Sequence, residues 1–236
     1  MSTKPAPWTL SPQLTAAPEL WRGLEAVFPL WEGTGDPQML GDMPVTTDLQ
    51  IATWGKTLNG ASVNGDGSAF SYVRSTQFPD VGPTNWTFVV SGVSGSNSQE
   101  RFHNLLINGE SNSIREQKMM IAARNGSQLQ AGIGDGNGNQ ASGAKFDVLK
   151  GNPFCIVVVY NGSVVKVFKN GDLIDSFSSS LQTNTISKFA VMGDPEKNLE
   201  WIGSVDFVSA YSRAVTDQEA RFITTDPFAM LRPAGF

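Results

Sequence analysis

From Gly23 onward, the chain consists of short apolar runs separated by residues typical of turns. Asn-Gly pairs recur between these runs, and this dipeptide tolerates the positive φ angles of tight hairpin turns. The pairs stand at 59–60, 64–65, 108–109, 125–126, 161–162 and 170–171. This spacing of runs and turns predicts many short antiparallel strands.

The clearest prediction is a unit of three successive antiparallel strands. Residues 154–160 are apolar throughout, as expected for a buried central strand. Residues 161–163 turn the chain into a second strand over 164–169, and Asn170-Gly171 then leads into a third strand over 172–177. Further strands are predicted over 68–74, 85–93, 104–108, 119–124, 128–133, 142–149, 186–192 and 201–211.

One helix is predicted near the C-terminus. Thr216-Asp217-Gln218-Glu219 is a capping box, in which the threonine hydroxyl and the glutamate carboxylate each accept from a backbone amide. The helix should end near Thr224, because Asp226-Pro227 disfavours helix before the proline. With no alternation of strands and helices, we expect an all-β antiparallel sandwich with one short C-terminal helix.

Length and proline content divide the chain into three parts. A length of 236 residues suits a single β-sandwich. Four prolines in residues 1–22 predict an extended N-terminal arm, which contacts either its own domain or another subunit. The expected organisation is therefore an arm over 1–22, a sandwich over 23–225 and a C-terminal tail over 226–236.

Composition and charge exclude several classes of partner. With 40% hydrophobic and 17% charged residues, the chain has ample material for a core. A formal net charge of −5 and a pI near 4.9 make nucleic acid and anionic membranes unlikely partners. No apolar run reaches the ~18 residues of a membrane span, and the start lacks a secretory signal, so we expect synthesis in the cytoplasm.

The residues that carry most enzyme chemistry are scarce. Cys155 is the single cysteine and His103 the single histidine, so an internal disulfide, a cysteine metal cluster and a multi-histidine zinc site are excluded. The Glu-x-Asp-x-x-Glu strand pattern of some glucanases is absent. The nearest carboxylate clusters, at 194–200 and at Asp172 with Asp175, fit solvated loops better. We expect no catalytic residues and no bound cofactor.

A glycine-rich loop and two tryptophans are the candidate contact residues. Residues 135–139 begin like a calcium loop, but Gln140 replaces the turn glycine and Phe146 the bidentate glutamate of an EF-hand. A surface turn is the preferred interpretation, with a non-helical calcium site as the alternative. Trp86 and Trp201 lie in apolar surroundings and should pack in the core. The candidate glycan or partner contacts are Trp8, Trp54, Asp135, Asn137 and Asn139.

Three segments resemble laminin-G-like, concanavalin A-like jelly-roll domains, especially those of tailed-bacteriophage virion proteins. Residues 23–36 are similar to the opening strand and its Glu-Gly-x-Gly turn, and residues 154–173 to a hairpin followed by an Asn-Gly turn. Residues 201–216 resemble a closing strand that ends Tyr-x-Arg-Ala-Leu-Ser/Thr, with Val215 in place of the leucine. The resemblance covers about residues 20–233 and implies the sandwich fold.

The resemblance implies a function through binding or packing. Our first expectation is a non-enzymatic virion structural protein, either a capsid decoration or a fibre-associated subunit. Such a protein would form a homo-oligomer and contact other virion proteins through its sandwich and termini. The alternative is a lectin-like adhesion module that binds a surface glycan, and a glycoside hydrolase ranks third.

Overall fold

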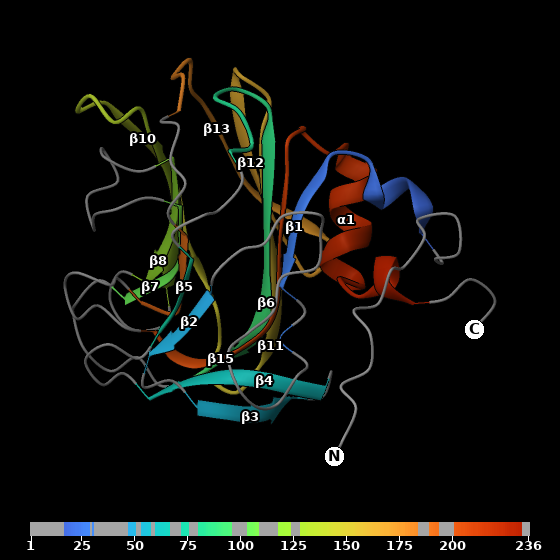
Figure 1. Cartoon of the computed structure of the whole chain (residues 1–236). Coiled ribbons are helices and arrows are strands. Elements are labelled where there is room, and N and C mark those ends of the chain that lie inside the picture. The colour runs from blue at the N-terminus through green and yellow to red at the C-terminus, as the bar shows by residue number, and fades with distance from the viewer. Residues whose placement is uncertain are drawn as a thin grey trace.

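The structure is a computed structural model that describes twelve parts of the chain. These are residues 17–28, 30, 47–50, 53–57, 60–66, 72–75, 80–95, 103–108, 118–123, 128–183, 189–193 and 201–232. Their strands form two antiparallel sheets that pack face to face, with a helix on the far side of one sheet (Figure 1). The expected all-β sandwich with one short C-terminal helix is confirmed.

The first sheet contains the long central strands. Its order is β13 (Asp172–Ser178), β12 (Val164–Lys169), β11 (Pro153–Tyr160), β6 (Trp86–Ser94), β15 (Ile202–Tyr211), β4 (Gly60–Asp66) and β3 (Thr53–Thr57). A further strand, β1 (Leu24–Phe28), pairs with the second half of β15.

The second sheet consists mostly of shorter strands. Its order is β10 (Gln140–Asp147), β9 (Gln128–Gly134), β8 (Met119–Ala123), β7 (His103–Asn108), β14 (Phe189–Val191), β5 (Tyr72–Ser75) and β2 (Thr47–Gln50).

The main core lies between the two sheets. Trp86 and Trp201 are fully buried there, which confirms their expected packing role. The Trp86 ring contacts Phe88 edge-on and tilts against Tyr160, with ring centroids 5.4 and 5.5 Å apart. Its indole Nε1 donates to Thr183 Oγ1 at 3.0 Å, so the buried polar atom of this side chain is satisfied.

A second core lies on the outer face of the first sheet. It is covered by α1 (Asp217–Thr225) and by the 3-10 helices η2 (Pro18–Trp21) and η4 (Ala229–Leu231) (Figure 1). Strand β11 is apolar throughout because it contributes to both cores, for example with Ile156 toward the second sheet and Val157 toward the helix. Trp21 Nε1 donates to the backbone oxygen of Met230 at 3.0 Å and joins η2 to η4.

The two sheets also meet along one edge. A register shift in β10 between Ser142 and Lys145 marks a β-bulge. Beside it, the backbone amide of Ala144 donates to Asp175 Oδ2 in β13 at 2.8 Å. Gly143 lies directly against this carboxylate, and a Cβ atom there would collide with it. The expectation that Asp172 and Asp175 occupy loops is therefore wrong, because both lie in β13.

Most predicted elements agree with the structure. The 154–177 unit is present as β11, β12 and β13, with Asn170 at φ 48° and Gly171 at φ 94° in the second turn. The capping box begins α1, which ends at Thr225. Of the expected N-terminal arm, residues 18–21 form η2 on the surface of this domain, whereas residues 1–16 lie outside the described residues.

One predicted turn is wrong. Asn64-Gly65 lies inside β4 and pairs there with Ser204 and Gly203 of β15. The Asn64 side chain accepts a hydrogen bond from Ser62 Oγ at 3.2 Å and lies over Gly55, where the absence of a side chain leaves room for it. Tertiary pairing with β15 thus overrides the local turn preference of the dipeptide.

Candidate functional site

The predicted contact residues lie at separate places. Trp54 lies in β3, at one edge of the first sheet, and its half-buried ring packs against the main core. The 135–139 loop joins β9 to β10, whose edge meets β13 at the opposite edge of that sheet. Trp8 lies outside the described residues. The structure therefore does not bring Trp54 and the loop into one site.

The 135–139 loop is organised by its own aspartate. Asp135 Oδ1 accepts from the backbone amides of Asn137 and Asn139 at 2.8 and 3.0 Å, and Asp135 Oδ2 accepts from Asn139 Nδ2 at 2.6 Å. The hydrogen bond from the Asn139 side chain contributes most to lowering the pKa of Asp135. Both carboxylate oxygens thus shape the turn.

Across the described residues, no group of three or more His, Cys, Asp or Glu is arranged to bind a metal ion.

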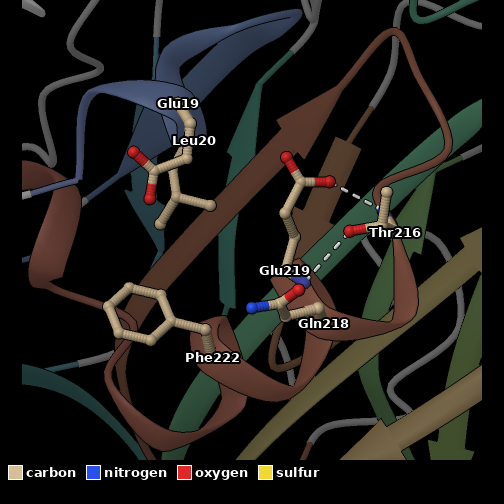
Figure 2. A pocket seen from close by; sticks show the side chains of 6 residues that line it. All are labelled: Glu19, Leu20, Thr216, Gln218, Glu219 and Phe222. Atoms are coloured by element: carbon tan, nitrogen blue, oxygen red, sulfur yellow. Dashed lines mark hydrogen bonds between the residues drawn. The ribbon is translucent and has the colours of Figure 1, made fainter.

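A pocket with a cavity volume of about 450 Å³ lies between η2 and the start of α1. Figure 2 shows Leu20 and Phe222 on one side of it and Thr216, Gln218 and Glu219 on the other. Glu19 also lines the pocket. The site therefore joins residues that are about 200 positions apart in the sequence.

Hydrogen bonds fix the polar wall of this pocket. The Glu219 amide donates to Thr216 Oγ1 at 3.2 Å, and the Thr216 amide donates to Glu219 Oε2 at 2.7 Å. Arg213 donates to both carboxylate oxygens of Glu219, at 2.7 and 2.8 Å, and its Nε donates to the backbone oxygen of Arg22 at 2.6 Å. Arg213 thus connects α1 to the segment that carries the opposite wall.

The two pocket glutamates differ in their surroundings. Burial alone would raise the pKa of Glu219, but hydrogen bonds from Arg213 and Thr216 outweigh burial and lower this pKa to about 2. Glu19 is exposed, and its carboxylate makes no hydrogen bond or ion pair with the described part of the chain. Glu219 is therefore a structural anion, whereas Glu19 is available to a ligand.

The apolar wall offers an accessible aromatic ring. Leu20 is buried and forms part of the pocket lining, whereas the Phe222 side chain is 43% exposed. On α1, Ala220, Ile223 and Thr224 face the sheet, so Phe222 lies outside the buried stripe. Gln218, one helical turn earlier, adds a carboxamide to the lining of the same pocket. An aromatic face beside amide and carboxylate groups can stack on a ring and hydrogen-bond to its hydroxyls.

The sequence interpretation did not single out Phe222. Helical periodicity could have indicated that Phe222 is exposed, because an apolar residue outside the buried stripe of a short amphipathic helix remains accessible. The other half of the site, Glu19 and Leu20, gave no such signal, since its position depends on how η2 docks.

A second, smaller pocket is lined by hydroxyl groups. It has a volume of about 340 Å³ and lies beside the β11–β12 turn, lined by Ser163, Ser178, Ser179 and Ser180. The Ser179 amide donates to the Ser163 backbone oxygen at 2.8 Å, which holds the strand ends together. Its described lining residues include no aromatic ring and no charged group, so it is the weaker candidate.

The two antiparallel sheets, one of them covered by a helix on its outer face, define a β-sandwich of the jelly-roll class. Residues 66–221 match the model of the concanavalin A-like lectin/glucanases superfamily, of the laminin G type. The match spans more than half of the chain, and the chain belongs to this family. The expected fold family is thus confirmed. A comparison with curated proteins finds no match.

Solved structures with the same fold include toxin binding domains. The botulinum neurotoxin serotype D binding domain has a TM-score of 0.69 at 11% identity, and that of Paraclostridial Mosquitocidal Protein 1 has 0.69 at 13%. The serotype D ligand binding domain in complex with N-acetylneuraminic acid has a TM-score of 0.67 at 11% identity. In each case 85% of this chain aligns with about half of the other chain. At these identities the likeness shows the fold alone.

Among the described residues, no helix is long and apolar enough to cross a membrane.

Proposed function

We propose that this protein is a glycan-binding module and that its site is the pocket between η2 and α1. The observation that carries the proposal is the exposed Phe222 ring in a pocket that is also lined by Gln218 and Glu19. A sugar ring has an apolar face and a rim of hydroxyls, so it needs an apolar surface with polar groups around it. The volume of about 450 Å³ lies within the ~300–1,000 Å³ common for small-ligand sites.

The comparisons support this proposal at the level of class. The family takes its name from lectins and glucanases, and one solved structure with this fold is a complex with N-acetylneuraminic acid. This chain corresponds to only about half of that structure, so the ligand of the toxin domain carries no residue assignment for this chain. The Phe222 pocket is therefore argued from its own geometry.

We propose binding without cleavage. Glycoside hydrolysis needs one carboxylic acid that protonates the leaving oxygen and a second carboxylate that acts as base or nucleophile. The pocket contains two glutamates, but Glu219 has a pKa of about 2 and is paired with Arg213. It therefore has no proton to donate at neutral pH, and its oxygens are already occupied by hydrogen-bond donors.

The test is a glycan array probed with the wild type, Phe222→Ala and Leu173→Ala. Leu173 is 40% exposed on β13, so its truncation is a matched apolar control outside the pocket. We expect the wild type to bind a set of glycans, Phe222→Ala to lose about tenfold in affinity, and Leu173→Ala to match the wild type. No binding by the wild type, or equal loss in both variants, would contradict the proposal.

A structural role in a bacteriophage virion is the second candidate. The observation that favours it is the exposure of Leu149 and Leu173, at 62% and 40%, near the β12–β13 turn. Lys169 of β12 links the two segments that carry these leucines. Its Nζ donates to the backbone oxygen of Asp147, two residues before Leu149, and its backbone pairs with Asp172, next to Leu173. Exposed leucines of this kind suit contact with another subunit.

This second role predicts a homo-oligomer or a complex with other virion proteins. Light scattering would compare the mass of the wild type with that of a double variant that carries both Leu149→Ser and Leu173→Ser. A lower mass of the double variant would show that these leucines support self-association. Electron microscopy of particles that lack the protein tests attachment directly. Particles of unchanged composition and stability would contradict the structural role.

A further inference from the structure

We infer that the pocket between η2 and α1 selects neutral or amine-bearing glycans and discriminates against glycans that carry a carboxylate. This inference rests on the proposed glycan-binding function and specifies its ligand class. It depends on the charges around the pocket and on which of them are already paired.

The arginine that supports the polar wall of the pocket is committed to a protein anion. Arg213 forms its ion pair with Glu219 at 2.7 Å, and their side chains are only 16% and 14% exposed. Lys166 pairs in the same way with Asp217, at 2.7 Å. Each of these pairs is electrically neutral. A ligand carboxylate would have to displace the Glu219 carboxylate to reach Arg213.

The N-terminus of α1 is also occupied. The start of a helix attracts anions because its first backbone amides lack helical partners. Here Glu219 Oε2 accepts from the Thr216 amide, and Thr216 Oγ1 accepts from the Glu219 amide. The carboxylates of Asp217 and Glu219 lie in the first turn and already face the positive end of the helix dipole. The terminus therefore resists a further anion.

Of the two glutamates that line the pocket, Glu19 is the one without an ion pair among the described residues. It lies on the wall opposite the capping box, exposed, and no cation of the described residues pairs with it. A neutral sugar can donate hydroxyl hydrogen bonds to this carboxylate, and an ammonium group can pair with it. A sugar carboxylate brings like charge into the same small volume, and like-charge juxtaposition is a common source of specificity.

The experiment measures affinity for pairs of probes that differ by one charge. Suitable pairs are glucose with glucuronic acid, galactose with galacturonic acid, and N-acetyllactosamine with its sialylated form. Glucosamine against N-acetylglucosamine tests the amine. We expect each carboxylated member to bind about tenfold more weakly at low salt, a difference that shrinks in ~0.5 M salt. Glucosamine should bind at least as well as its N-acetylated form.

Two variants separate the pocket charge from the charge of the whole protein. Glu19→Gln should lower, several-fold, the ratio of the affinity for a neutral probe to the affinity for its carboxylated counterpart. Asp172→Asn removes the same charge from an exposed position on β13 and should leave the ratio unchanged. A ratio that does not respond to Glu19→Gln, or that responds equally to both variants, would overturn the inference.

The possible failures are distinguishable. Tighter binding of the carboxylated probes, lost in Phe222→Ala, would overturn the charge selectivity and leave the proposed function standing. Absence of binding to every probe would overturn the proposed function, and the inference with it.

Discussion

Glu219 has two hydrogen-bonding partners, Arg213 and Thr216, which depend on its charge and on its place in the helix. Its carboxylate accepts from Arg213 and from the Thr216 amide, and its own amide donates to Thr216 Oγ1. These hydrogen bonds favour the ionised form, which is why the pKa of this half-buried group is about 2. The same interactions hold the polar wall of the pocket in place before any ligand binds.

The charge of Glu219 should make stability depend on pH. Its folded-state pKa of about 2 lies below the ordinary value of 4.5, so the contribution is complete above about pH 4.5 and is lost as the pH falls toward 2. We expect Glu219→Gln to lower the free energy of unfolding by about 1–2 kcal/mol at pH 7. Urea denaturation at pH 7 and pH 3 checks this, since the difference from wild type should shrink at pH 3.

The matched control is Asp172→Asn, which removes an exposed carboxylate without a capping role. It should change stability by less than about 0.5 kcal/mol at either pH. An equal effect of the two variants would mean that overall charge, and not the ion pair of Glu219 with Arg213, is responsible.

Asp135 provides a second test at the residue scale. Its carboxylate oxygens already accept from Asn137 and Asn139, so we expect no stabilising calcium ion in this loop. Addition of about 1 mM calcium should leave the melting temperature unchanged. A rise that disappears in Asp135→Asn would instead establish the calcium alternative.

Single residues were predicted from sequence with mixed success. The burial of Trp86 and Trp201 followed from their apolar neighbours. The 135–139 turn was also recognisable from its glycines and asparagines. Polar neighbours made Trp54 look accessible, but its ring is half-buried against the core. Neighbours in sequence cannot show which face of a strand packs.

Among the strands, those with the clearest apolar runs in the sequence pair in the middle of the first sheet. Strands β6, β11 and β15 form long antiparallel ladders, and their apolar runs made them predictable. Strands β2 and β3 lie at sheet edges and are short and polar, and the pattern gave no signal for them. Edge strands need fewer apolar residues, since one side of each has no neighbouring strand.

The bulge in β10 allows a prediction about the edge of the sandwich at which β10 and β13 meet. A side chain at Gly143 would collide with the Asp175 carboxylate, which accepts from the Ala144 amide. We expect Gly143→Ala to lower the free energy of unfolding by about 1–3 kcal/mol. In an Asp175→Ala background the same change should cost less, because the carboxylate is gone. Additive effects in this double-mutant cycle would show that the two positions do not interact.

At the scale of the whole molecule, the fold and the site were predictable to different degrees. Strand spacing, the capping box and the resemblance to laminin-G-like domains were sufficient for the sandwich and its covering helix. The pocket depends on η2 docking beside α1, through Trp21 with Met230 and Arg213 with Arg22. These contacts join opposite ends of the sequence, and no local pattern contains them.

We predict that a glycan binds in the pocket between η2 and α1. Amide chemical-shift mapping by NMR, with the best glycan from the array added stepwise to the labelled protein, tests this most directly. We predict that the largest saturable shifts fall on Leu20, Gln218 and Phe222. Shifts confined to the 135–139 loop or to the serine pocket at residues 178–180 would contradict the claim.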